Sequence, residues 1–226
     1  DVAREIVDRR LADPDEDNKL LWLYRLSQIF IKHLDYENMV YVISDLLEIT
    51  KEMNVENATY QETIYDLFFA YDRLRDEENV LATGEEIERF YKDDIRNIRV
   101  YKKMMQIAET NLDDSLMIFY SEKIIALQQL HKSYIESPWV DFVLVKSYSE
   151  YKQYEKALAV LDNLDEVYKK VPSINIAKVR YLQSEVRRKM GDAKAEKSLL
   201  EECAKSKDVI WPAVCKNTLK WISFNN

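Results

Sequence analysis

The sequence predicts an all-α protein built from repeated pairs of helices, and three observations support this fold class. Only two glycines and four prolines occur in 226 residues, so strand-and-turn folds lack the turn residues that they need. Long stretches carry apolar residues at helical spacing. Segments 20–46 and 138–164 also match each other at one fixed offset, each with a helix, a short polar turn and a second helix. Such a pair cannot bury its apolar face alone and is expected to stack on further copies.

The two clear copies agree at several apolar positions. Alignment of Met39 with Ala157 brings the other matches into register, and these are Leu26 with Leu144, Phe30 with Tyr148, Tyr36 with Tyr154, Ile43 with Leu161 and Leu46 with Leu164. Weaker copies lie between and after them, so we expect about five antiparallel helix pairs in a single array over residues 1–226. The pairs are predicted at 18–53, 59–92, 93–132, 138–171 and 174–206.

Partial helices are expected at both ends of the array. A first element over 2–12 has apolar residues at helical spacing and ends at the acidic segment 13–17, where Pro14 prevents simple continuation. A strongly apolar last helix is predicted over 212–224. These ends lead us to interpret the chain as a fragment of a larger protein.

Apolar stripes define the first helices of the first three pairs. Polar connections are expected at 54–59 and at 111–115, and the second of these also supplies helix-capping residues. Gly84 lies inside a predicted helix, and close packing of a neighbouring helix would explain it. The stripes are Leu20, Leu23, Leu26 and Phe30; Ile64, Leu67, Phe68 and Tyr71; and Ile98, Tyr101, Met105 and Ala108.

Prolines and one glycine separate the remaining elements. Pro138 opens the fourth pair at the start of a helix, where its missing N–H costs nothing. Pro172 divides that pair from the fifth. In the fifth pair, Met190 followed by Gly191 predicts a helix end with the next helix starting at once.

Residues 18–206 resemble the tetratricopeptide repeat (TPR) family. The run 154–157, Tyr-Glu-Lys-Ala, matches the Tyr-x-x-Ala-like element that opens the second helix of that repeat, whereas 36–39 has Met in place of the small residue. The run 190–195 with the leucines at 199 and 200 is a partial match. The resemblance implies a right-handed α-solenoid that binds a protein or peptide on a concave face lined by first helices.

The sequence departs from the family in two respects. Ser27, Phe68 and Val145 stand where the family has glycine, which implies helices that lie farther apart or cross differently. Equivalent positions in the second helices are 41, 35, 42 and 38 residues apart, against 34 in the family, so we expect longer helices and an irregular superhelix. These positions are Met39, Val80, Ser115, Ala157 and Ala195.

The family's geometry, projected on this sequence, selects eight candidate partner-binding residues on first helices. Aromatic residues beside Arg or Lys have the composition of interface hot spots, although a core position between repeats is the alternative for each aromatic. The candidates are Tyr24, Gln28, Tyr65, Phe69, Arg73, Trp139, Phe142 and Lys146. The first helices lack the Lys and Asn set with which the chaperone-binding subtype of the family clamps a terminal carboxylate.

The sequence predicts no catalytic, metal or cofactor site. His33 and His131 have no metal-ligand spacing, and two isolated glycines cannot form a phosphate-binding loop. We therefore expect a non-catalytic protein-protein interaction scaffold. One alternative is a structural section of a larger bacterial cell-envelope or motility-type assembly, joined through the array ends. Another, from a different class, is a small-ligand-binding regulator or an enzyme.

Charge is distributed unevenly along the chain. The net charge of −8 divides into −12 over residues 1–138 and +4 over residues 139–226, and the acidic part disfavours nucleic-acid binding. The densest basic face consists of Arg96, Arg99, Lys102 and Lys103. We expect these residues either to pair with the nearby Asp93, Asp94 and Glu109 or to receive an acidic partner segment.

The two cysteines bear on the cellular compartment of the protein. Cys203 and Cys215 flank a short connection, so they form either a disulfide in an oxidising compartment or two buried thiols in the cytosol. No apolar run approaches the ~20 residues that cross a bilayer, so the segment is not expected in the membrane. The cytoplasm and the bacterial periplasm both remain open, depending on an unseen leader and on the state of these cysteines.

Overall fold

Helices joined by turns make up the residues that the computed structural model describes, namely 2–12, 16–53, 58–133, 136, 138–168 and 174–225, and no strand occurs among them. Pro14, Pro172 and most of the predicted connection at 54–59 lie outside these residues. The chain separates into two compact parts, unit 1 over residues 1–107 and unit 2 over residues 108–226, and each is described by itself.

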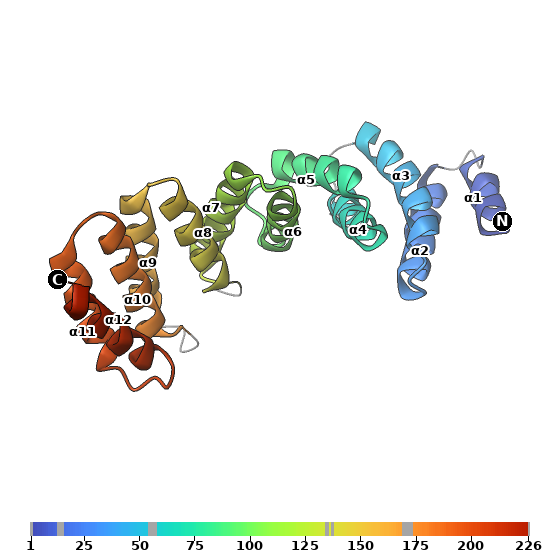
Figure 1. The fold of residues 1–226 in the computed structure, drawn as a ribbon. Helices are drawn as coiled ribbons and strands as arrows, with labels where there is room; N and C mark the ends of the chain where they lie inside the picture. The colour runs from blue at the N-terminus through green and yellow to red at the C-terminus, as the bar shows by residue number, and fades with distance from the viewer. Residues whose placement is uncertain are drawn as a thin grey trace. The chain divides into compact units, whose positions relative to one another are not determined.

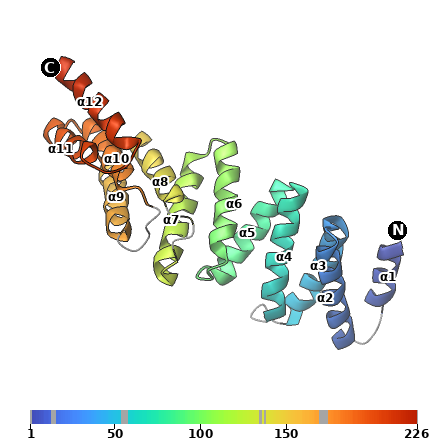
Figure 2. The ribbon, with the colours of Figure 1, turned by 90° about the horizontal axis from the view of Figure 1, so that it is seen from below.

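Unit 1 contains α1 to α5 and most of α6. α2 packs on α3, α3 on α4 and α4 on α5, and Figures 1 and 2 show α2, α3 and α4 side by side. The bounds are Val2–Leu11 for α1, Glu16–Lys32 for α2, Tyr36–Met53 for α3, Ala58–Leu74 for α4, Glu77–Tyr91 for α5 and Asn97–Thr110 for α6.

α6 begins four residues later than the sequence predicted. The carboxylate of Asp94 accepts the backbone N–H of Arg96 at 2.8 Å, and this local bond competes with helix formation. Residues 93–96 therefore form a connection between α5 and α6.

The core of unit 1 follows the predicted apolar stripes. Leu23, Ile64, Phe68, Tyr101 and Met105 are all buried. The glycine in α5 explains how closely the helices pack, because a Cβ at this position would lie 2.6 Å from the Met104 Sδ atom and 3.3 Å from the Phe68 Cε2 atom. The side chains of α4 and α6 thus occupy the space beside Gly84, as its helical position suggested.

Unit 2 contains α7 to α12, and each of these helices packs on the next. Its core includes Leu144, Leu161, Val179 and Leu200. Figures 1 and 2 show α9, α10 and α11 close together. The bounds are Asp114–His131 for α7, Trp139–Glu150 for α8, Tyr154–Tyr168 for α9, Ile176–Lys189 for α10, Ala193–Ala204 for α11 and Trp211–Asn225 for α12.

One turn recurs at the end of α2, α4, α6, α8 and α10. In each case a residue with positive φ follows the helix, and the next residue donates its N–H to a carbonyl five positions earlier. The same next residue accepts the N–H four positions later, which starts the second helix. The positive-φ residues are Leu34 at 58°, Arg75 at 60°, Leu112 at 56°, Lys152 at 57° and Gly191 at 80°.

This recurring turn corrects the register predicted from the sequence. In each pair, one residue in the first turn of the second helix donates its N–H to the residue that follows the positive-φ position. This donor is Met39 in the first pair, Met117 in the third and Glu196 in the fifth. The sequence alignment had placed Ser115 and Ala195 there. The five turns are 41, 37, 40 and 39 residues apart, so the repeat is more regular than the predicted spacings indicated.

The three positions where the TPR family has glycine lie in the interior. Ser27, Phe68 and Val145 are each buried, so side chains larger than glycine fill these parts of the first helices.

Candidate functional site

The recurring turn aligns two columns of residues on the first helices. The aromatic column lies ten positions before each positive-φ residue and consists of Tyr24, Tyr65, Lys102, Phe142 and Tyr181. A second column lies six positions before each positive-φ residue and consists of Gln28, Phe69, Gln106, Lys146 and Glu185. Six of the eight predicted partner-binding residues belong to these columns, and only Arg73 and Trp139 fall outside them.

In unit 1, cations lie over two aromatic rings of α4. The guanidinium carbon of Arg96 is 4.2 Å from the centroid of Tyr65, and that of Arg99 is 4.8 Å from the centroid of Phe69. Both distances fall within the ~6 Å range of cation–π attraction. We call this region the α4–α6 surface, and it consists of Glu62, Tyr65, Phe69, Asp72, Arg96, Arg99 and Lys103.

Acidic residues of unit 1 neutralise two cations of the α4–α6 surface. Arg96 contacts Asp94 at 2.8 Å and Glu62 at 2.7 Å, and the Lys103 Nζ atom lies 2.5 Å from Asp72. The bonds to Asp94, together with those to Glu62, hold the pKa of Arg96 above its ordinary value. The expected partner Asp94 is therefore present, and α4 supplies two more acids that the sequence did not indicate.

The remaining unit 1 candidates differ in how accessible they are. Tyr65 is buried, and its hydroxyl donates to the Asn97 Oδ1 atom at 2.5 Å. Gln28 donates to Asp66 at 3.3 Å and is exposed, as is Arg73. Tyr24 packs against the core of unit 1 and is partly buried.

In unit 2, the first helices α8 and α10 enclose a pocket of about 350 Å³, here called the α8–α10 pocket. Phe142 and Lys146 both line it, so the structure brings these two predicted residues into one site. Trp139 is 40% exposed at the start of α8 but does not line the pocket. The other lining residues are Val145, Ser149, Lys178, Tyr181, Leu182, Glu185, Val186 and Lys189.

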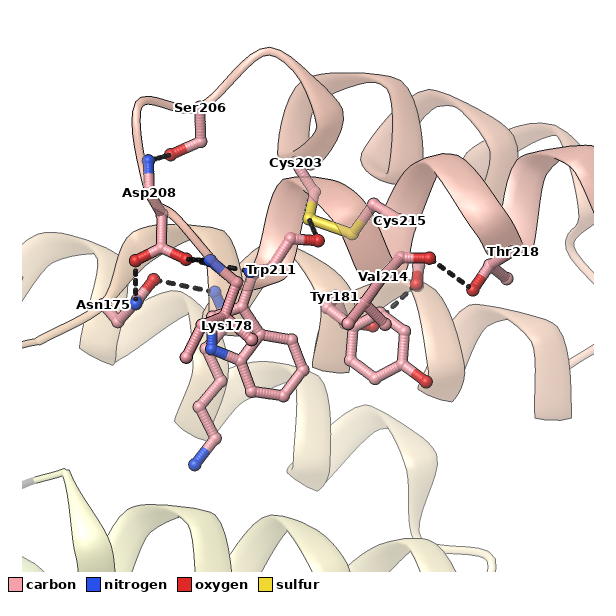
Figure 3. Close-up of a disulfide and its surroundings, with 12 residues drawn as sticks. Asn175, Lys178, Tyr181, Cys203, Ser206, Asp208, Trp211, Val214, Cys215 and Thr218 are labelled. Carbon is pink, nitrogen blue, oxygen red and sulfur yellow. Dashed lines mark hydrogen bonds between the residues drawn. A yellow bond between two sulfur atoms is a disulfide. The ribbon is translucent and has the colours of Figure 1, made fainter.

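Lys178 joins the α8–α10 pocket to the start of α12. Its Nζ atom lies 4.0 Å from the centroid of Phe142 and 5.9 Å from that of Trp211. The centroids of the Trp211 and Tyr181 rings are 5.2 Å apart, and Figure 3 shows the two rings next to each other with Lys178 beside Trp211. The position of α12 therefore helps to fix two residues that line the pocket.

Two sets of bonds hold the start of α12 in place. Cys203 of α11 and Cys215 of α12 form a disulfide with their Cα atoms 6.1 Å apart (Figure 3). The Asp208 carboxylate accepts N–H bonds from Trp211 at 2.8 Å, Ile210 at 2.9 Å and the Asn175 side chain at 2.7 Å. These bonds, that from Trp211 foremost, hold the pKa of Asp208 below its ordinary value.

A second pocket of unit 2, of about 270 Å³, lies between α9, α10 and α11, and its charged groups bind one another. Arg180 contacts Asp165 at 2.7 Å and Glu202 at 3.1 Å, while Gln183 donates to Asp162 at 2.7 Å. These bonds link the three helices, so we assign them a structural role.

Neither clustered metal ligands nor membrane-spanning helices are found in the described part of the chain. No group of three or more potential metal ligands comes together there. Equally, none of its helices combines the length and the apolar character needed to cross a bilayer.

Sequence reasoning missed the contribution of α10 to the α8–α10 pocket. Tyr181 precedes Gly191 by ten residues, as Phe142 precedes Lys152, so the register of the turn would have identified it. The positions of Arg96 and Arg99 over the α4 rings carried no comparable signal, because they depend on the path of the chain between α5 and α6.

Comparison with known proteins establishes the class of fold. No family model and no curated protein matches the sequence. The structure is similar to a putative kinesin light chain from Podosopora anserina with nearly identical TPR-like repeats, at 13% identity over 84% of this chain and 95% of that chain, with a TM-score of 0.50. It is also similar to BtubC (BKLC) from P. vanneervenii, at 13% identity over 89% of this chain and 87% of that one, with a TM-score of 0.48.

The fold is thus that of a divergent TPR-like helical repeat protein. Proteins of this class are generally non-catalytic scaffolds, whose stacked repeats present extended surfaces to other proteins.

Proposed function

We propose that this protein is a non-catalytic scaffold that binds a partner protein or peptide on the face of its first helices. The α8–α10 pocket is the observation that carries the proposal. In it, Phe142 and Lys146 meet Tyr181 and Leu182 from the next first helix. A pocket that combines apolar and aromatic side chains with a few polar groups is the usual form of a binding site.

The arrangement of these side chains favours binding energetically. The Phe142 ring already lies beneath Lys178, and Tyr181 already packs on Trp211. Side chains that are held in place before binding lose little conformational entropy when a partner arrives. In unit 1, the α4–α6 surface offers a second contact region, with Phe69 beneath Arg99.

Affinity capture with the whole chain tests the proposal. The purified protein is immobilised, incubated with native lysate, and the retained proteins are quantified by mass spectrometry. We expect Phe142→Ala to reduce recovery of the partner at least tenfold, because the aromatic anchor of the pocket is lost. Tyr151→Ala is the matched control, since Tyr151 is an aromatic residue 49% exposed at the end of α8 and does not line the pocket.

Circular dichroism of each variant separates lost binding from lost folding. If folded Phe142→Ala recovers the same proteins in the same amounts as the unchanged protein, the α8–α10 pocket is not the binding surface.

A second candidate function is a structural section of a larger bacterial cell-envelope assembly. The disulfide between Cys203 and Cys215 favours it, because disulfides persist in oxidising compartments such as the periplasm. Trp221 and Phe224 of α12 are 61% and 88% exposed and offer apolar surface for assembly. Sedimentation analysis of the whole chain over a range of concentrations tests this candidate, and a monomer at every concentration would count against it.

A further inference from the structure

We infer that the α8–α10 pocket selects an acidic segment of the partner protein that carries one bulky apolar side chain. This inference rests on the proposed function, because it specifies the ligand of the same first-helix face. It follows from the size of the pocket, from the charges around it and from the length of its walls.

The size of the pocket suits a single anchoring side chain. Its volume of about 350 Å³ lies near the lower end of the ~300–1,000 Å³ typical of ligand pockets. Phe142, Tyr181, Leu182 and Val186 supply its aromatic and aliphatic lining. One large apolar side chain would fill much of this space and remove these surfaces from water, whereas a small side chain would leave them exposed.

The charges around the pocket are unbalanced. No ion pair joins Lys146, Lys178 or Lys189 to a carboxylate of any described residue. The single acidic residue of the lining, Glu185, is already bound by Arg188 at 2.6 Å. The lining therefore carries three lysines and one already paired carboxylate, and carboxylates on a partner are complementary to this positive charge.

The arginines of α10 differ from the lysines of the pocket in having carboxylate partners. Arg180 and Arg188, on the same helix as Lys178 and Lys189, are paired with carboxylates within the protein. The same holds for Arg96 and Lys103 of the α4–α6 surface. These cations have carboxylate partners within the protein, whereas the lysines of the pocket have none among the described residues, and Lys178 instead lies over the Phe142 and Trp211 rings.

The lengths of the pocket walls define the ligand further. The lining runs from Phe142 to Ser149 on α8 and from Lys178 to Lys189 on α10, which at ~1.5 Å per residue corresponds to about 10 and 16 Å of helix. An extended peptide advances ~3.3 Å per residue, so about three to five residues span the site. Lys178 and Lys189 stand at opposite ends of the α10 wall, which favours acidic residues on both sides of the apolar anchor.

Four fluorescein-labelled octapeptides test the inference by fluorescence anisotropy. They share one length and differ only in a central Phe or Ala and in flanking residues that are Glu or Gln. We expect the peptide with Glu and Phe to bind at least tenfold more tightly than the peptides that lack either feature. Its affinity should also fall as salt is added, because mobile ions screen exposed charges.

Charge reversal identifies the site of binding. The double variant Lys178→Glu, Lys189→Glu should weaken binding of the peptide with Glu and Phe at least tenfold. The matched control is Lys197→Glu, Lys216→Glu, which makes the same change in net charge at two exposed lysines outside the pocket and should leave the affinity unchanged. Circular dichroism verifies that both double variants are folded.

Four results would overturn the inference. Equal binding of the Gln and Glu peptides would show that the lysines do not select charge. Equal effects of the two double variants would place binding elsewhere. Concentration-dependent self-association that the pocket variant alone removes would identify a second copy of this chain as the occupant. If no peptide binds but Phe142→Ala still abolishes partner capture, the proposed function stands and the acidic ligand is wrong; if capture is also unchanged, both fail.

Discussion

Replacement of Leu112 by glycine tests whether the recurring turn stores strain. Leu112 has a φ of +56°, in the left-handed region, and its side chain is 87% exposed. An L-residue in this conformation costs ~1–2 kcal/mol, which glycine avoids because it has no Cβ. Leu112→Gly should therefore relieve strain and lose little buried surface.

The size of the effect follows from two opposing terms. Relief of the left-handed conformation stabilises the folded state by ~1–2 kcal/mol, whereas the greater freedom of glycine in the unfolded chain costs ~0.4–1 kcal/mol. We expect a net gain of about 0.8 kcal/mol in the free energy of unfolding. Gly191 offers the reciprocal change, since its φ is +80° and no heavy atom lies within 4 Å of an added Cβ. Gly191→Ala should lose about the same amount.

Urea unfolding followed by far-UV circular dichroism measures both changes. Leu112→Ala is the control, because it removes the same exposed side chain but keeps a Cβ in the left-handed conformation, and it should remain within ~0.5 kcal/mol of the unchanged protein. Hydrogen exchange of the segment around α7 locates the gain. If Leu112→Gly proves less stable than Leu112→Ala, the left-handed turn is not strained and the reasoning is wrong.

Three further predictions concern other parts of the two units. The disulfide closes a loop with a sequence separation of 12, which in the chain-entropy model stabilises the folded state by roughly 2.8 kcal/mol. The double variant Cys203→Ser, Cys215→Ser should therefore increase hydrogen exchange in α11 and α12. Equal exchange with and without the bond would contradict this. Tyr65→Phe leaves the buried Asn97 Oδ1 atom without its donor and should lower the free energy of unfolding by ~1–3 kcal/mol in urea titrations, and an unchanged midpoint would show that the bond contributes nothing. Burial raises the pKa of Glu196 above 4.5, so the folded state binds this proton more tightly than the unfolded chain and stability falls as pH rises from 4.5 through the folded pKa. Glu196→Gln should consequently be more stable than the unchanged protein at neutral pH, with the difference shrinking below pH 4.5, and a difference that does not vary with pH would refute the assignment.

The helices were predictable because their apolar stripes match the buried faces. The register of the third pair was not predictable from the sequence. Glycine usually marks a left-handed residue after a helix, but Leu112 occupies that position here. Gly191 did provide that signal, and there the alignment was wrong by a single residue. The sequence therefore indicated which segments repeat, whereas the turn residues that define their register came from backbone geometry.

The candidate site was predictable only in part, for a related reason. Phe142 and Lys146 follow from their positions on a first helix, and both line the α8–α10 pocket. The opposite wall, from Lys178 to Lys189, requires knowledge of which faces of α8 and α10 meet. Nor could the sequence show that the nearby arginines are paired while these lysines are not, because ion pairs such as that of Arg180 with Asp165 join different helices.

The division between paired arginines and unpaired lysines on α10 separates recognition from stability. A substitution at the exposed Lys189 breaks no ion pair among the described residues, and surface changes of this kind usually alter stability by no more than ~0.5 kcal/mol. A substitution at Lys178 also breaks no ion pair with a described residue, although it removes the contacts with the Phe142 and Trp211 rings. Arg180 connects α9 to α11 and has no such freedom. Ligand preference at this face can therefore be redesigned, or can diverge among related chains, by exchanging lysines while the helical framework stays intact.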